Sequence, residues 1–270
     1  MARQGAHGER KGVTGGIFGP KMPVSNEPVS AMFERCADRH PERTALIFEG
    51  GRWTYRELNR RANRLAHHLL AAGVGLETPV AVELERSPEQ IMCLLAVLKA
   101  GGAYVPLAPS LPATRRRYII ENSGLELLLG RDARSEAYGG LPIQTMTLND
   151  VGGREGGGEN PTNESGGDRL GCILYTSGST GRPKGVWMLH RTMTSLIRWK
   201  QRAYPLEAGD VVLQKTPYVF DVSVWEIFAP ISFGMRLVVP APGVHREPHA
   251  MAELIRRHRV THLQVVPSQL

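Results

Sequence analysis

One short stretch of this chain combines the residue types that bind phosphate. It reads Tyr175-Thr176-Ser177-Gly178-Ser179-Thr180-Gly181-Arg182-Pro183-Lys184-Gly185. Glycines let backbone N–H groups approach an anion closely, hydroxyl groups donate hydrogen bonds, and a lysine adds a positive charge. Apolar runs at 172–174 and 186–189 predict strands on both sides of the stretch. The sequence therefore predicts a phosphate-binding loop between two strands.

Two simpler interpretations of this loop are weaker. The Walker pattern requires Gly-Lys followed by Ser or Thr, whereas Lys184 stands between Pro183 and Gly185. A flexible Ser/Gly-rich linker is the other alternative. The apolar flanks and the proline inside the loop count against a linker, so phosphate binding remains the better interpretation.

A second stretch, residues 215–228, places a carboxylate at the start of a predicted helix. Ser223 and Glu226 have the spacing of a capping box, and the apolar residues that follow form one helical stripe. Asp221 lies between Phe220 and Val222, so we expect its carboxylate in apolar surroundings at the edge of this helix. It could cap the helix, or it could pair with the ammonium group of a ligand.

The composition limits the classes of protein to which this chain can belong. With 270 residues, of which 41% are hydrophobic, it can form one large domain or two lobes. No apolar stretch approaches the ~20 residues that a membrane span needs, and residues 1–21 lack the apolar core of a secretory signal. Cys36, Cys93 and Cys172 lie far apart, which predicts buried reduced thiols in a cytoplasmic protein.

The net charge of +7 invites a nucleic-acid interpretation. The basic residues form only short runs on predicted helix faces, at 115–117 and 256–257, and acidic residues are scattered among the others. No recognition module such as a zinc finger is present in the sequence. We therefore expect neither a nucleic-acid partner nor a membrane partner.

Helix and strand signals alternate along most of the chain, which predicts an α/β fold with largely parallel sheets. The helix that starts with the capping box of Thr54 and Glu57 should end at Gly73, and Ser87 should cap the next helix. Further helices are expected near 114–122, 191–201 and 251–258. Strands are expected at 44–48, 79–84, 103–106, 125–129, 211–214, 236–239 and 262–266.

Several motifs together give a family resemblance that covers residues 28–270. The loop at 175–185 resembles the nucleotide loop of adenylate-forming enzymes, which include acyl-CoA ligases, luciferases and the adenylation domains of nonribosomal peptide synthetases. Residues 215–228 resemble the stretch of amino-acid-activating members in which the Asp after Phe binds the substrate amino group. Other segments resemble further family motifs in the right order: 53–58, 98–107, 243–248 and 260–268.

The resemblance implies roles for individual residues and an organisation of the chain. The implied nucleotide- or phosphate-binding residues are Thr176, Ser177, Gly178, Ser179, Thr180, Gly181 and Lys184. The implied substrate-binding residues are Asp221, Val222, Trp225 and Gln264. The implied organisation is a disordered leader (1–27), a first α/β lobe of the AMP-binding core (28–150), a Gly-rich mobile loop (151–168), and a region with the phosphate loop and amino-acid pocket, truncated at its C-terminus (169–270).

The implied fold has stacked mixed or parallel sheets flanked by helices, as an incomplete N-terminal core of the adenylate-forming fold. The implied reaction activates an amino acid with ATP and Mg²⁺ as an aminoacyl-adenylate, and a carrier-protein thiol then accepts the acyl group. The resemblance implies no metal ligand and no catalytic residue within these residues, because the family's catalytic lysine would lie beyond Leu270.

The start Asp-Val-Trp is similar to pockets for serine or another small polar amino acid, from which Gln264 departs. Ala108 also departs from the family pattern, which has Asp before the proline that is Pro109 here. Two alternatives remain open. One is an acyl-CoA or aryl-acid ligase of the same superfamily, although Asp221 would repel an acid that has no amine. The other is a truncated, inactive protein that only binds nucleotide.

Overall fold

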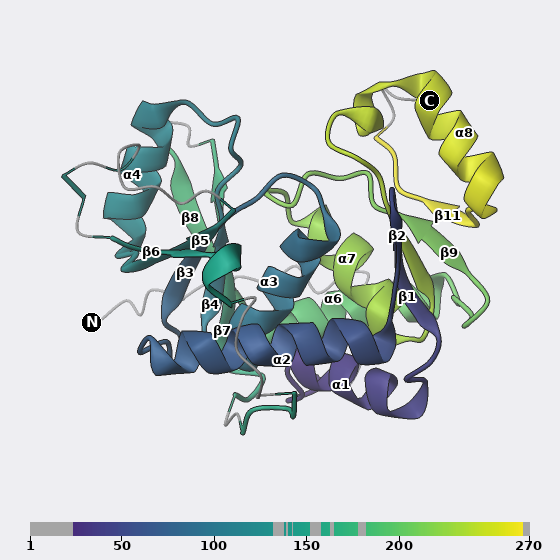
Figure 1. Ribbon diagram of the computed structural model, residues 1–270, viewed down its shortest axis with the longest axis horizontal. Coiled ribbons are helices and arrows are strands. Elements are labelled where there is room, and N and C mark those ends of the chain that lie inside the picture. The colour runs from purple at the N-terminus through teal and green to yellow at the C-terminus, as the bar shows by residue number, and fades with distance from the viewer. Residues whose placement is uncertain are drawn as a thin grey trace, which may run out of the picture.

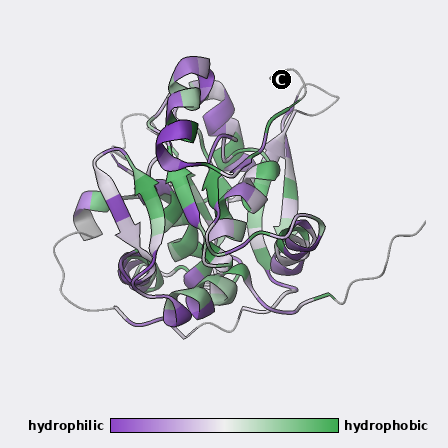
Figure 2. Ribbon diagram, turned by 90° about the vertical axis from the view of Figure 1, so that its right-hand side faces the viewer, coloured by the Kyte–Doolittle hydropathy of each residue, from purple (hydrophilic) through white to green (hydrophobic). Residues whose placement is uncertain are grey.

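The computed structural model describes residues 24–131, 138, 140, 141, 143–151, 158–162, 165–177 and 182–266. Its strands form two separate sheets, and helices lie between the sheets and around them (Figure 1). The predicted α/β fold with mixed, largely parallel sheets is confirmed. Figure 2 shows hydrophobic residues concentrated in the central strands and hydrophilic residues on the outer helices.

The first sheet has five strands in the order β11-β9-β10-β1-β2. Their bounds are β11 (His262–Leu263), β9 (Val211–Leu213), β10 (Arg236–Val239), β1 (Thr44–Phe48) and β2 (Gly51–Thr54). Neighbouring strands are parallel except for the hairpin pair β1 and β2. The strand predicted at 262–266 is shorter than expected, because only two of its residues pair with β9.

The second sheet has six strands in the order β6-β5-β3-β4-β7-β8. Their bounds are β6 (Gln144–Thr147), β5 (Leu127–Gly130), β3 (Pro79–Glu83), β4 (Ala103–Pro106), β7 (Leu170–Thr176) and β8 (Lys184–Leu189). Only β7 and β8 pair in antiparallel fashion. Each sheet takes strands from both sides of residues 151–168, so the division proposed there passes through both sheets.

Helices carry most connections between the parallel strands. They are α1 (Val29–Arg39), α2 (Tyr55–Ala71), α3 (Pro88–Lys99), α4 (Ala113–Ser123), α5 (Leu148–Val151), α6 (His190–Ala203), α7 (Val222–Ser232), α8 (Pro248–His258) and the short 3₁₀ helix η2 (Val244–Arg246). One large hydrophobic core joins α1, α2, α3 and α7 to both sheets. α3 and α7 are buried along almost their whole length, which explains their nearly continuous apolar sequences.

The local signals for helix starts are confirmed by hydrogen bonds. The hydroxyl of Thr54 accepts from the backbone N–H of Glu57 at 3.2 Å, and the Glu57 carboxylate accepts from the Thr54 N–H at 2.7 Å. Ser87 caps α3 by accepting from the Gln90 N–H at 3.2 Å. These two helix caps were predictable from the sequence because the bonded residues lie within four positions of each other.

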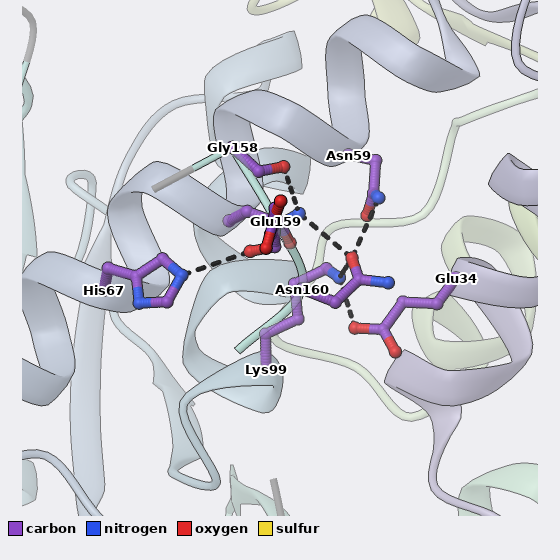
Figure 3. A network of polar contacts seen from close by, with 8 residues as sticks. Glu34, Asn59, His67, Lys99, Gly158, Glu159 and Asn160 are labelled. Carbon is purple, nitrogen blue, oxygen red and sulfur yellow. Dashed lines mark hydrogen bonds and ion pairs between the residues drawn. The ribbon is translucent and has the colours of Figure 1, made fainter. Parts of the chain in front are cut away.

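Part of the segment 151–168 is held by a polar network between α1, α2 and α3 (Figure 3). The side-chain oxygen of Asn160 accepts from Asn59 at 2.9 Å, Asn63 at 3.0 Å and the ammonium of Lys99 at 3.2 Å. Lys99 also pairs with Glu34, and burial lowers the Lys99 pKa while this carboxylate raises it. Residues 158–160 are therefore fixed against α2, although mobility was expected here; 152–157, 163 and 164 lie outside the described residues.

Candidate functional site

The predicted phosphate loop lies at the open end of the β7–β8 hairpin. Thr176 at the end of β7 is the direct cross-strand partner of Lys184 at the start of β8. Both side chains are exposed, as is Ser177, which follows Thr176. Two hydroxyl groups and one ammonium therefore lie near each other at this end of the hairpin, where they can donate hydrogen bonds to an anion. Gly178, Ser179, Thr180 and Gly181 lie outside the described residues.

The hairpin is anchored on its β7 side. β7 is buried against β4 as far as Leu174, and the hydroxyl of Tyr175 donates to the side-chain oxygen of Asn122 in α4 at 2.9 Å. Gly185 lies opposite Tyr175, where a Cβ would be 3.1 Å from a methyl carbon of Ile173 and 3.2 Å from the Tyr175 ring. This close approach explains a glycine directly after Lys184, and it fixes where the lysine leaves the sheet.

Asp221 is the N-cap residue of α7, and its carboxylate accepts from the backbone N–H of Val222 at 2.8 Å. The expectation of apolar surroundings is wrong. Asp221 is exposed, and its neighbours Phe220 and Val222 are 58% and 38% exposed. The chain turns here in a short loop outside the core, so sequence neighbours of apolar type do not enclose the carboxylate. Asp221 is accordingly free to meet a ligand while it caps the helix.

The capping box predicted from Ser223 and Glu226 is absent. The Ser223 hydroxyl instead lies 2.5 Å from the carbonyl oxygen of Phe220. The Glu226 carboxylate accepts from the backbone N–H groups of Lys215 at 3.0 Å and Thr216 at 2.7 Å, and from the Thr216 hydroxyl at 3.1 Å. Glu226 therefore holds the loop that leads to Asp221. Burial raises the pKa of Glu226 to about 7 against the opposing effect of these hydrogen bonds.

Two residues without a recognisable sequence signal also fix this loop. The buried guanidinium of Arg86 donates to the carbonyl oxygen of Lys215 at 2.7 Å. The hydroxyl of Tyr218 lies 2.7 Å from the carbonyl oxygen of Leu107 and 2.9 Å from that of Val82. Both residues join the loop before α7 to the second sheet. No local pattern could have identified them, because their partners lie more than 100 positions away along the chain.

The remaining predicted pocket residues meet at α6. Trp225 lies one turn after Asp221 on α7, is 5% exposed, and packs under the ammonium of Lys200, which is 4.8 Å from the centroid of the Trp225 ring. The same ammonium donates to the side-chain oxygen of Gln264 at 3.2 Å. The structure therefore brings Trp225 and Gln264 together through a lysine that sequence reasoning missed. A lone Lys in the last turn of a helix carries no signal of such a role.

The structure thus gathers the predicted residues into two groups. Thr176, Ser177 and Lys184 lie on the hairpin. The predicted substrate-binding residues lie at the start of α7 and just after β11: Asp221, Val222, Trp225 and Gln264. Within the described part of the chain, no hydrogen bond joins one group directly to the other. They are linked through the fold instead, because β7 pairs with β4 and Leu107, directly after β4, meets Tyr218.

A hollow of about 600 Å³ lies near the carboxyl ends of β3 and β5. It is lined in part by Glu83, Arg86, Arg116, Arg131 and Tyr138. Glu83 accepts from Arg116 at 2.6 Å and also from the Tyr138 hydroxyl. These hydrogen bonds offset the negative charge of the Glu83 carboxylate on the wall of the hollow.

Two other kinds of site are absent from the described residues. None of the helices in the described ranges has the length and apolarity needed to cross a lipid bilayer. Among the same residues, no three His, Cys, Asp or Glu side chains are grouped so that they could hold a metal ion. The donors on the hairpin fit phosphate oxygens, whereas the described residues supply no cluster of protein ligands for Mg²⁺.

Comparison with known proteins agrees with this geometry. Residues 33–270 match the family described as AMP-binding enzyme. The chain is 40% identical over 243 residues to zwittermicin A synthase ZmaJ of Bacillus cereus, covering 90% of this chain and 46% of that protein. It is 41% identical over 241 residues to tyrocidine synthase 3 of Brevibacillus parabrevis, covering 88% of this chain and 4% of that protein. The chain thus spans less than half the length of these relatives.

A solved structure of similar fold carries a bound ligand. The nonribosomal peptide synthetase FmoA3 in its alpha-methyl-L-serine-AMP bound form has a TM-score of 0.84 and 31% identity, covering 92% of this chain and 28% of that one. Its AMPPNP bound form has a TM-score of 0.81 and 32% identity, covering 89% of this chain and 25% of that one.

Proposed function

Because this chain belongs to the AMP-binding enzyme family, we propose that it supplies the phosphate loop and part of the amino-acid pocket of an enzyme that activates an amino acid as its aminoacyl-adenylate. The observation that carries the proposal is the position of Asp221. Its carboxylate is exposed at the start of α7, on a loop fixed by Glu226, Arg86 and Tyr218. A fixed carboxylate that faces outward is suited to bind the α-ammonium group of an amino acid.

In the proposed reaction, a carboxylate oxygen of the amino acid attacks the α-phosphorus of ATP. The bond from that phosphorus to the bridging oxygen breaks, and pyrophosphate leaves with the electron pair. Thr176, Ser177 and Lys184 would orient the phosphates by donating hydrogen bonds from the hairpin, while Asp221 would hold the amino acid. Catalysis of this kind depends mostly on positioning and charge neutralisation. Mg²⁺ would enter with ATP and offset the charge of its phosphates.

The family resemblance extends the proposal to substrate and partner. We propose an amino acid with a small polar side chain as the substrate and the phosphopantetheine thiol of a carrier protein as the acceptor of the acyl group. FmoA3, which is described as a nonribosomal peptide synthetase and holds alpha-methyl-L-serine-AMP, supports this assignment. The three cysteines are buried and unpaired, which supports a reducing, cytoplasmic setting.

The test is amino-acid-dependent exchange of labelled pyrophosphate into ATP by the complete polypeptide that carries this chain. Wild type should exchange with one or a few amino acids. Asp221→Asn should lower kcat/KM for the amino acid by about 100-fold, equivalent to about 3 kcal/mol, because the ammonium group loses its charged partner. Asn still caps a helix, so α7 should keep its start. Asp38→Asn, a change of the same type at an exposed position on α1, is the matched control.

The two alternatives predict other results. An acyl-CoA or aryl-acid ligase would exchange with acids that lack an amine, and Asp221→Asn would not impair it. An inactive nucleotide-binding protein would bind ATP but show no exchange with any acid. Exchange with an amino acid that Asp221→Asn leaves unchanged would contradict the role proposed for Asp221.

A further inference from the structure

Lys200 is a half-buried cation with aromatic neighbours and no acidic partner among the described residues. It lies in the last turn of α6, with its ammonium 4.8 Å from the ring centroid of Trp225 and 5.4 Å from that of Tyr204. The buried or half-buried cations Lys99 and Arg116 each face a glutamate instead. In the described part of the chain, the polar contact of the Lys200 ammonium is the side-chain oxygen of Gln264 at 3.2 Å.

This cation lies beside the proposed position of the amino acid. Asp221 and Trp225 are four residues apart at the start of α7, so their side chains project from the same face, about 6 Å apart along the axis. α6 packs against α7, as Figure 1 shows, and this packing brings Lys200 onto the Trp225 ring. Lys200 therefore lies over the ring of Trp225, which is one helical turn from Asp221 on α7.

The groups gathered here are rich in hydrogen-bond donors. An ammonium group has three N–H bonds, of which one points to Gln264. The indole N–H of Trp225 is buried and has no hydrogen-bond partner among the described residues. The side-chain oxygen of Gln264 accepts from Lys200, and its amide nitrogen donates to the carbonyl oxygen of Val265 at 3.4 Å, which leaves its second amide N–H as a donor. An oxygen acceptor would complement this set, whereas a second cation would be repelled by Lys200.

We propose that Lys200, together with Gln264, selects amino acids whose side chain ends in an oxygen acceptor, namely a carboxylate, a carboxamide or a hydroxyl group. The proposal rests on the proposed function, in which Asp221 binds the α-ammonium group of the same substrate. Lys200 acts on the side chain of the substrate and takes no part in the transfer of the adenylyl group from ATP to the carboxylate. Amino acids with a cationic side chain are excluded by charge repulsion.

The experiment compares side chains of similar size in pyrophosphate exchange by the complete polypeptide. The pairs are serine with alanine, asparagine with leucine, and aspartate with ornithine. In the pair whose size fits the pocket, wild type should exchange faster with the amino acid whose side chain ends in oxygen. Lys200→Met keeps an unbranched chain over Trp225 but removes the charge, and it should reduce that preference by 10-fold or more while the KM for ATP stays unchanged. Lys200→Glu should raise exchange with ornithine relative to aspartate.

Two further variants separate selection from folding. Arg202→Met removes one positive charge from an exposed position at the same end of α6 and should leave the preference as in wild type. Gln264→Leu should weaken the preference in the same direction as Lys200→Met. If Lys200→Met and Gln264→Leu both retain the wild-type ratios, the inference is wrong although amino-acid activation stands. If wild type prefers apolar or cationic side chains, the inference also fails. If wild type exchanges with no amino acid, the proposed function itself fails.

Discussion

The hydroxyl of Tyr218 lies 2.7 Å from the carbonyl oxygen of Leu107, and this contact connects the loop before α7 to the end of β4. Tyr218 is buried, and its hydroxyl also lies 2.9 Å from the carbonyl oxygen of Val82, which belongs to β3. The loop that presents Asp221 is thereby attached to two strands of the other sheet. The fold thus fixes the candidate amino-acid site relative to the sheet that carries the candidate phosphate-binding hairpin.

Removing this contact should loosen the site. Tyr218→Phe deletes only the hydroxyl group and leaves two buried carbonyl oxygens without it, so we expect the free energy of unfolding to fall by about 1–2 kcal/mol. Urea unfolding measures the change. Tyr204→Phe, at a position where the side chain is 57% exposed, serves as the control and should cost almost nothing. Equal stability of the two variants would show that the buried hydroxyl does not brace the loop.

Glu226 should make stability depend on pH in an unusual direction. Burial raises the pKa of its carboxyl group in the folded state to about 7, above the ordinary value of 4.5. The folded state therefore binds the proton more tightly than the unfolded state, and stability falls as pH rises from about 4.5 to 7. We expect this contribution to be about 3 kcal/mol. The free energy of unfolding of wild type minus that of Glu226→Gln should decrease by about this amount between pH 4 and pH 8.

The comparison between the two proteins isolates Glu226 from other titrating groups. His190 is buried, and burial lowers its pKa to about 4, which makes stability rise with pH between about 4 and 6.5. That effect is common to wild type and variant and cancels in the difference. A difference that stays constant with pH would show that the Glu226 carboxyl has the same pKa in the folded and unfolded states, and would contradict the prediction.

A side chain at position 185 should strain the β7–β8 hairpin. A Cβ at this position would lie 3.1 Å from a methyl carbon of Ile173 and 3.2 Å from the Tyr175 ring, so Gly185→Ala should destabilise the protein by about 1–2 kcal/mol. The displaced strand should also weaken ATP binding, because Lys184 is the preceding residue. Gly209→Ala is the matched control, since its Cβ would meet nothing within 4 Å. Calorimetric ATP titration and urea unfolding of both variants check the prediction.

Asn160 should contribute more to stability than its exposure suggests. Its side-chain oxygen accepts hydrogen bonds from Asn59, Asn63 and Lys99. Asn160→Ala removes this acceptor and all three hydrogen bonds. We expect a loss of about 1–3 kcal/mol in the free energy of unfolding. Asn122→Ala, which removes one exposed hydrogen bond from Tyr175, should cost clearly less. Similar losses in the two variants would show that the network in Figure 3 adds little.

Features carried by neighbouring residues were predictable from the sequence. The capping box of Thr54 and Glu57, the cap at Ser87 and the strands at 44–48, 103–106 and 236–239 all formed as expected, because their signals are local. The same local reasoning was wrong about Ser223 and Glu226. The Glu226 carboxylate instead accepts from the backbone N–H groups of residues 215 and 216, so it does not bond to the backbone at the start of α7 as a capping box requires.

The sequence by itself determined the positions of most helices and strands, the residue types of the loop that includes Lys184, and the presence of a carboxylate at the start of α7. Only the tertiary structure decided that Asp221 is exposed, that Arg86 and Tyr218 fix its loop, and that Lys200 joins Trp225 to Gln264. The physical reason is the range of the interactions. Capping and periodicity act within a few residues, whereas these contacts join residues brought together by the packing of helices against two sheets.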